Sequence, residues 1–196
     1  APAFIEGWQP KKTRTAFWEN EALVRAHLTP LCETSVMRSI GDEVIIQDPS
    51  NFVLNIQDFH VVSWKTSEKI QYNQLTDMVI AWGIGCTSTS NTITIVKDGM
   101  LLGNGCGRTS RVDAAELAVK IAQQYNPLKI SNASAYSDSF FPQTDGVEKL
   151  SDAGVKTILT SSGSQKDQEV IDFCINHQLA LAMVPDREAR GFNGHC

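Results

Sequence analysis

Residues 103–111, Gly-Asn-Gly-Cys-Gly-Arg-Thr-Ser-Arg, could bind an anion. They lie between a predicted strand and a predicted helix. In a glycine-rich turn of this kind, backbone N–H groups can face an anion at the positive end of the helix, and Arg111 adds a charge. The glycines could equally serve only a tight turn. Because no Gly-Lys-Ser/Thr follows, the stretch is not a P-loop.

Three further polar stretches each have two interpretations. Residues 87–92 carry five hydroxyl groups and the amide of Asn91. These groups could bind an alkali cation or the edge of a neutral polar substrate, or the segment could simply be an exposed turn. Residues 138–142, Asp-Ser-Phe-Phe-Pro, place a carboxylate beside two aromatic residues. This stretch is either part of a binding site or a packed loop whose rings supply buried area. Residues 161–164 are a second candidate anion-binding turn or a helix cap, with no arginine in place.

Composition excludes several classes of protein. The net charge of −5 argues against a general nucleic-acid binder, and no apolar run approaches the roughly 20 residues that span a bilayer. No Cys-x-x-Cys pair and no zinc-deaminase signature is present, so we expect a protein without zinc. The five cysteines are widely spaced and are interpreted as reduced thiols of a cytoplasmic protein.

The pattern along the chain predicts alternating helices and strands, as in α/β proteins. Residues 1–12 are expected to be irregular, and Lys97-Asp98-Gly99-Met100 is a predicted hairpin turn. The strongest helical stripe, 112–125, follows Ser110 as N-cap. The other predicted helices are 16–27, 75–84, 146–153 and 165–177. The predicted strands are 44–47, 52–56, 61–64, 92–96, 101–103, 133–137, 157–159 and 179–183.

Taken in order, several short motifs resemble the C-terminal half of the AICAR (aminoimidazolecarboxamide ribonucleotide) transformylases, the formyltransferase part of a bifunctional purine-synthesis enzyme that also carries IMP cyclohydrolase. The motifs are Ser90-Asn91, Lys97-Asp98-Gly99, Gly103-x-Gly105-x-Gly107, Ser110-Arg111-Val112-Asp113, Ser137-Asp138-Ser139-Phe140-Phe141-Pro142-x-x-Asp145, Gly163-Ser164 and Arg190-x-Phe192. The resemblance divides the chain into a lead-in with a helix, 1–37, and a transformylase-like subdomain, 38–196.

The resemblance implies a fold, ligands and site residues. The fold is a cytidine-deaminase-like α/β three-layer sandwich without zinc, in a dimer whose sites lie between subunits. The ligands are AICAR and formyltetrahydrofolate. The matching residues are Asn91, Ser110, Arg111, Val112, Phe140, Asp145, Arg190 and Phe192. The residues that resemble the family's potassium-binding loop are Ser88, Ser90, Thr92 and Asp138.

The roles that the resemblance implies suit these residue types. Asn91 would stabilise the formyl-transfer transition state. The two arginines would lie near the nucleotide, where a planar bidentate donor suits phosphate or carboxamide oxygens. The two phenylalanines would line the site, and Asp145 would face the pterin of the folate. Potassium would be structural.

The chain departs from the family pattern in three places. One is the C-terminus, Arg190-Gly191-Phe192-Asn193-Gly194-His195-Cys196, which differs from the usual basic, histidine-rich ending. The family's Lys-His pair, whose histidine shuttles a proton from the substrate amine, does not occur in this sequence, and Gln143 and Thr144 replace the usual Phe and Arg. Two hypotheses follow. The chain is an enzyme subdomain that transfers a formyl group when a complementary subdomain or subunit supplies the pair, or it is a non-catalytic nucleotide-binding or regulatory homologue.

Overall fold

The computed structural model describes residues 14–17, 36–40, 43–47, 52–125 and 127–186. The chain divides into two compact units, 1–51 and 52–196. The resemblance predicts that the transformylase-like subdomain begins at residue 38, and this boundary stays a prediction. In the first unit the strands β1 (Arg14–Phe17), β2 (Val36–Ile40) and β3 (Glu43–Gln47) form an antiparallel sheet in the order β1-β3-β2.

The second unit is an α/β domain built on a six-stranded sheet, so the predicted α/β class is confirmed. The sheet order is β4-β9-β8-β7-β5-β6. Its strands are β4 (Ser63–Trp64), β5 (Ile93–Lys97), β6 (Met100–Gly105), β7 (Ser134–Ser137), β8 (Thr157–Ser162) and β9 (Ala180–Pro185). Strands β7, β8 and β9 are parallel, whereas the pairs β5–β6, β5–β7 and β4–β9 are antiparallel.

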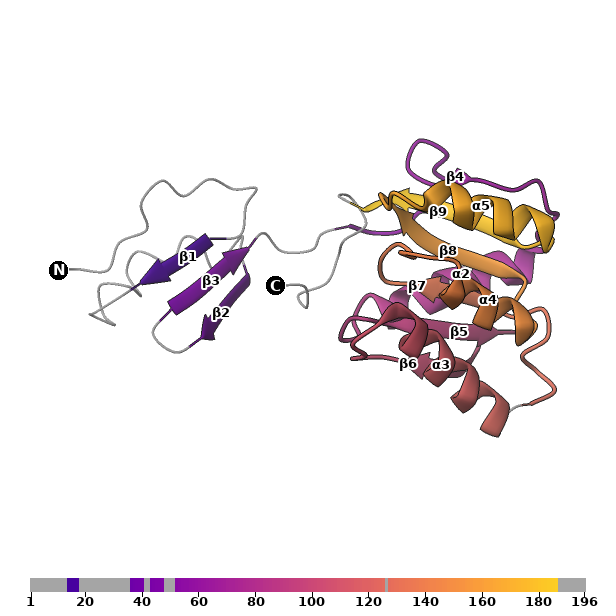
Figure 1. Cartoon of the computed structure of the whole chain (residues 1–196), viewed down its shortest axis with the longest axis horizontal. Coiled ribbons are helices and arrows are strands. Elements are labelled where there is room, and N and C mark those ends of the chain that lie inside the picture. The colour runs from indigo at the N-terminus through magenta and orange to yellow at the C-terminus, as the bar shows by residue number, and fades with distance from the viewer. Residues whose placement is uncertain (1–13, 18–35, 41–42, 48–51, 126, 187–196) are drawn as a thin grey trace. The chain divides into compact units, whose positions relative to one another are not determined.

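Helices cover both faces of this sheet (Figure 1). The helices α3 (Arg111–Tyr125), α4 (Asp145–Asp152) and α5 (Asp167–Asn176) lie on one face, and α2 (Tyr72–Gly85) lies on the other. Strand β5 serves both cores, because Ile93 and Ile95 are buried with α3 while Val96 is buried with Met78 and Ala81 of α2. This is the alternation expected of a strand buried on both faces.

Helix α3 begins where the sequence predicts it. The hydroxyl of Ser110 accepts a hydrogen bond from the backbone N–H of Asp113 at 3.1 Å, as an N-cap does. The alanines that face the core from α3 are fully buried, and they let the helix backbone lie close to β6. Arg111 is therefore presented from the first turn of a helix that is fixed at both its cap and its packed face.

Three predicted elements differ from the structure, wholly or in part. Ala16 and Phe17, predicted to begin a helix, belong to β1, and the rest of that helix lies outside the described residues. Residues 52–56 form no strand, and only Ser63–Trp64 of the predicted strand 61–64 joins the sheet. The side chains of Asn55 and Asp58 accept hydrogen bonds from the backbone N–H groups of Gln57 and His60, and such local bonds compete with strand pairing.

In the part of the chain that the structure describes, Cys86, Cys106 and Cys174 are free thiols, and no helix there is long and apolar enough to cross a membrane. Burial raises the pKa of the Cys174 thiol to about 12. We expect iodoacetamide at pH 8 to modify exposed Cys106 and to leave Cys174 unmodified, because a protonated, buried thiol is a poor nucleophile. Peptide mass spectrometry after native and denatured alkylation measures this, and modification of Cys174 in the native protein would contradict it.

Candidate functional site

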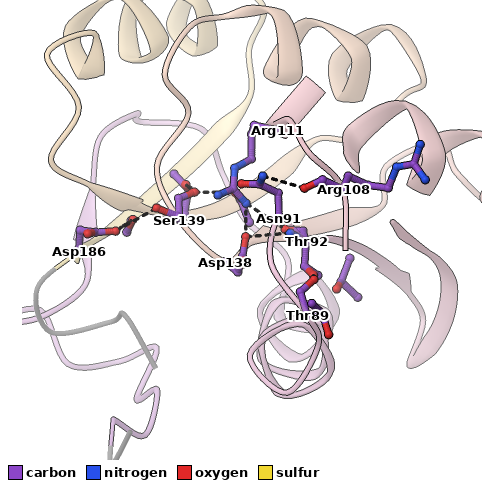
Figure 2. Close-up of polar contacts among 12 residues, drawn as sticks. Thr89, Asn91, Thr92, Arg108, Arg111, Asp138, Ser139 and Asp186 are labelled. Atoms are coloured by element: carbon purple, nitrogen blue, oxygen red, sulfur yellow. Dashed lines mark hydrogen bonds and ion pairs between the residues drawn. The ribbon is translucent and has the colours of Figure 1, made fainter. Parts of the chain in front are cut away.

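The candidate site lies at the end of the sheet where β7 ends and β5 begins (Figure 2). Asn91 and Thr92 precede β5, Arg108 follows β6, Arg111 opens α3, and Asp138 follows β7. The order of the strands brings these segments together, because β5 lies between β6 and β7. A site of this kind, at the carboxyl ends of parallel strands, is common in α/β domains.

A buried ion pair between Arg111 and Asp138 forms the base of the site. The side chains are 5% and 0% exposed. Arg111 Nη1 donates to Asp138 Oδ1 and, at 3.4 Å, to the carbonyl of Thr92. The same carboxylate oxygen accepts the backbone N–H of Thr92 at 3.0 Å, and Asp138 N–H donates to Thr92 O at 3.2 Å. The pair thus connects the first turn of α3 to both β5 and β7.

Two atoms of this pair are buried without a partner among the described residues. They are Arg111 Nε, a donor, and Asp138 Oδ2, an acceptor. A buried polar atom without a hydrogen bond is costly, so such atoms often mark the place of a water, an ion or a ligand group. One donor and one anionic acceptor therefore lie unpartnered beneath the site, buried from solvent.

Asn91 is held by the loop that follows β6. Both its backbone N–H and its Nδ2 donate to the carbonyl of Arg108, at 3.2 and 2.9 Å, and Arg108 N–H donates back to Asn91 O at 3.3 Å (Figure 2). Gly107, at φ +65°, donates to Thr89 O at 2.6 Å. Within the described structure Asn91 Oδ1 accepts no hydrogen bond, and the guanidinium of exposed Arg108 has no partner.

The other predicted ligand residues of this unit lie at the start of α3, in the segment after β7 and at the start of α4. Ser110 caps α3, and half-buried Val112 is the second residue of that helix. Half-buried Phe140 lies near Gly163, whereas Phe141 is 1% exposed and belongs to the core. Asp145 opens α4, where its Oδ1 accepts the N–H of Gly146 at 2.8 Å. Arg190 and Phe192 lie outside the described residues.

Of the four residues that resemble the potassium loop, the structure brings Thr92 and Asp138 into direct contact. Thr92 Oγ1 donates to Thr89 O at 2.6 Å and keeps lone pairs for another partner. Ser88 Oγ donates to Ile84 O at 2.9 Å and accepts from Asn104 Nδ2 at 3.0 Å. Ser90 makes polar interactions of its own. Among the described residues no group of three His, Cys, Asp or Glu side chains could hold a metal.

A cluster of hydroxyl groups around Asp186 was missed by the sequence analysis. Ser139 Oγ and Ser161 Oγ donate to Asp186 Oδ1 at 3.1 and 2.7 Å. The carbonyl of Ser139 accepts the hydroxyls of Ser137 and Thr160 at 2.6 and 3.0 Å. The available signal was a carboxylate directly after a buried apolar run, which places Asp186 at the same edge of the sheet as Asp138.

Tyr136, on β7, was also missed. The side chain is 4% exposed, and a Cβ built at Gly85 would overlap Cδ1 of its ring and lie 2.8 Å from Cε1, so the ring packs directly on the last turn of α2. Burial, and then the charge of Asp138, raise the pKa of Tyr136. A phenol in these surroundings stays neutral and can donate a hydrogen bond.

Comparison with known proteins gives a consistent result. The model of the AICARFT/IMPCHase bienzyme family matches residues 17–121, which include Asn91, Arg108 and Arg111. The proteins named bifunctional purine biosynthesis protein PurH from Neisseria meningitidis serogroup A and from Neisseria gonorrhoeae are each 34% identical over 154 residues. The matched region is 79% of this chain and 28% of each relative, so the chain spans less than a third of their length.

Proposed function

Because this chain belongs to the AICARFT/IMPCHase bienzyme family, we propose that it acts in purine biosynthesis as part of an AICAR transformylase, binding AICAR beside Asn91, Arg108 and Arg111. The observation that carries the proposal is the arrangement of these residues around the buried pair. The open acceptor of the Asn91 amide lies next to the Arg111–Asp138 pair, in which Arg111 Nε and Asp138 Oδ2 are unpartnered. The backbone of Arg108 holds Asn91, and the exposed guanidinium of Arg108 extends away from the pair (Figure 2). A ribonucleotide with a phosphate and a carboxamide offers matching groups.

The reaction is formyl transfer from formyltetrahydrofolate to AICAR. Asn91 hydrogen-bonds the reacting groups and stabilises the charge that develops on them. Phe140 and Asp145 belong to the folate face, together with Arg190 and Phe192. Without a Lys-His pair in the sequence, proton transfer depends on a complementary subdomain or subunit, since general acid–base catalysis contributes roughly 10²–10⁴-fold. The assembly is a dimer in the cytoplasm.

Potassium is a structural ion in this proposal. The residues that would hold it are Ser88, Ser90, Thr92 and Asp138. Neutral hydroxyl oxygens and one carboxylate suit an alkali cation, and the unpartnered Asp138 Oδ2 is an acceptor without a donor in the described structure. Bound there, the ion would fix the segment before β5, which carries Asn91.

The fold that we propose is the cytidine-deaminase-like sandwich, without zinc. What supports it is the order β6-β5-β7-β8-β9, with β5 antiparallel to β7 and with α2 as the only described helix on one face. In this fold the nucleotide would bind at the end of the sheet that carries Asn91, above the Arg111–Asp138 pair.

Calorimetry with AICAR on the full chain tests the nucleotide site. We expect binding by the wild type and roughly tenfold weaker binding by Asn91→Ala and by Arg108→Ala, because each removes hydrogen-bonding groups without opening the core. Lys120→Ala, which removes an exposed cation elsewhere, is the matched control for Arg108→Ala and should bind like the wild type. A wild-type protein that does not bind AICAR would contradict the nucleotide site.

A formyl-transfer assay separates the two functional hypotheses. Turnover is expected when the chain is mixed with a transformylase fragment that carries the Lys-His pair. Binding of AICAR without turnover in that mixture would favour the non-catalytic homologue, which keeps the nucleotide site and regulates through it.

A further inference from the structure

A polar cavity of about 400 Å³ lies at the opposite end of the same sheet from Asn91 and Asp138. Strand β5 runs from the candidate site to Lys97, which lines the cavity, and five strand residues span roughly 15 Å. The register aligns Ser134, Thr157 and Ala180 at this end. The lining residues that the argument uses are Lys69, Lys97, Asp98, Asn132, Lys156 and Gln178.

The floor of the cavity is rigid. Thr157 and Ala180, at the starts of β8 and β9, line it and are 1% and 3% exposed. The Thr157 hydroxyl hydrogen-bonds Ser134 Oγ at 2.8 Å, and Ser134 Oγ donates to Gln74 O at 3.1 Å. These bonds tie β7 and β8 to the first turn of α2, so the cavity exists before any ligand binds.

The lining has an excess of positive charge although the chain is acidic. Three lysines face two carboxylates, in a chain of net charge −5. Lys97 Nζ and Lys156 Nζ are oriented by the carbonyls of Ser131 and His177, and each ammonium keeps donors for another partner. The first turn of α2 also borders the cavity and has no acidic residue. These groups together favour an anion.

Amide side chains enter the cavity from strained backbone positions. The residues other than glycine with positive φ in the described structure are Asp98, Asn132 and Gln178, and all of them line the cavity. Gln178 follows α5 at a position where glycine is usual, since Leu179 N–H donates to Cys174 O at 2.9 Å. The backbone N–H groups of Asn132 and Gln178 donate to Gly154 O and Ile175 O, whereas within the described structure their side-chain amides make no hydrogen bond, so both side chains are available to hydroxyl groups.

We propose that this cavity binds a phosphorylated monosaccharide, at a site separate from the candidate nucleotide site. The lysines bind the phosphate, and the amides of Asn132 and Gln178 hydrogen-bond the sugar hydroxyls. The volume lies within the range of small-molecule sites. A phosphate alone would leave the side-chain amides unused, and a neutral sugar would leave the net positive charge of the lining unbalanced.

Titration of the full chain with glucose 6-phosphate, followed by amide NMR, tests this site. We expect shifts at Asp98, Asn132 and Gln178, and at least roughly tenfold weaker binding by the Lys97→Gln/Lys156→Gln variant, because two charge-assisted contacts are lost. The Lys120→Gln/Lys149→Gln variant carries the same change of charge on α3 and α4 and should bind like the wild type. Glucose should not bind, and inorganic phosphate should bind more weakly than the sugar phosphate.

A second variant separates binding from folding. Gln178→Gly relieves a left-handed glutamine, so its Tm should equal or exceed that of the wild type while its affinity for glucose 6-phosphate falls several-fold. Arg108→Ala should leave this binding unchanged, so failure of the nucleotide site and failure of the cavity are distinguishable. The proposal is overturned if millimolar glucose 6-phosphate does not bind, if the shifts appear only at Asn91 and Arg108, or if neither cavity variant weakens binding.

Discussion

Replacing Asp138 by alanine is expected to lower the free energy of unfolding by about 3–5 kcal/mol, the cost of leaving a buried charge without its partner. The Arg111 guanidinium would keep one contact, to the Thr92 carbonyl at 3.4 Å, in a position where its side chain is 5% exposed. The N–H of Thr92 would lose its acceptor as well. Urea unfolding followed by far-UV circular dichroism measures the loss.

Two further variants identify the cause of the Asp138 effect. The Arg111→Met/Asp138→Ala double variant removes both charges, so it should be more stable than Asp138→Ala alone, because an apolar replacement of a buried pair costs less than an isolated charge. Asp152→Ala removes an exposed carboxylate from the end of α4 and should lie within about 0.5 kcal/mol of the wild type. If Asp138→Ala unfolds at the same urea concentration as the wild type, the buried pair contributes nothing to stability.

Replacing Gly105 by alanine is expected to destabilise the second unit by about 3 kcal/mol through overpacking between β6 and α3. A Cβ at Gly105 would overlap the carbonyl oxygen of Ala114 and would lie 2.8 Å from the backbone nitrogen of Ala118. Both neighbours are backbone atoms on the buried face of α3, so no flexible side chain can move aside. The midpoint of urea unfolding reports the change.

Gly83→Ala is the matched control for this substitution. Gly83 lies in α2, and a Cβ there would have no atom within 4 Å. Because alanine favours the helix over glycine by about 1 kcal/mol, this variant should be slightly more stable than the wild type. A Gly105→Ala protein as stable as Gly83→Ala would show that α3 is not held against β6 in the way the structure describes. A shift of α3 would also move Arg111, so AICAR binding should fall together with stability.

Local patterns were sufficient for much of the second unit. The stripe of apolar residues from 112 to 125, with Ser110 as cap, predicts α3, and the Asp98-Gly99 turn predicts the β5–β6 hairpin. Where a predicted strand is absent, local side-chain hydrogen bonds compete with strand pairing. Asn55 and Asp58 make side-chain hydrogen bonds that divert residues 52–62 from pairing, although the apolar residues around them resemble a strand.

For the candidate site, the sequence identified some of the residues but not their contacts. Sequence motifs singled out Asn91, Arg111 and Asp138, but motifs do not state what a side chain contacts. The structure turns the Arg111 guanidinium towards Asp138. Arg108, which the motifs did not single out, contacts Asn91 through its carbonyl, while its guanidinium is exposed. Asp186 was passed over because a single carboxylate after an apolar run is common.

By itself the sequence determined the α/β class, the family and the helix that presents Arg111, since these depend on residue types and on neighbours a few positions apart. Only the tertiary structure decided that β5 pairs with β7 as well as with β6, which joins Thr92 to Asp138 across 46 residues and places Asp138 against Arg111 in the buried ion pair. The same pairing gathers Lys97, Lys156 and Gln178 at the other end of the sheet. Contacts of this range follow from strand order, which no local pattern encodes.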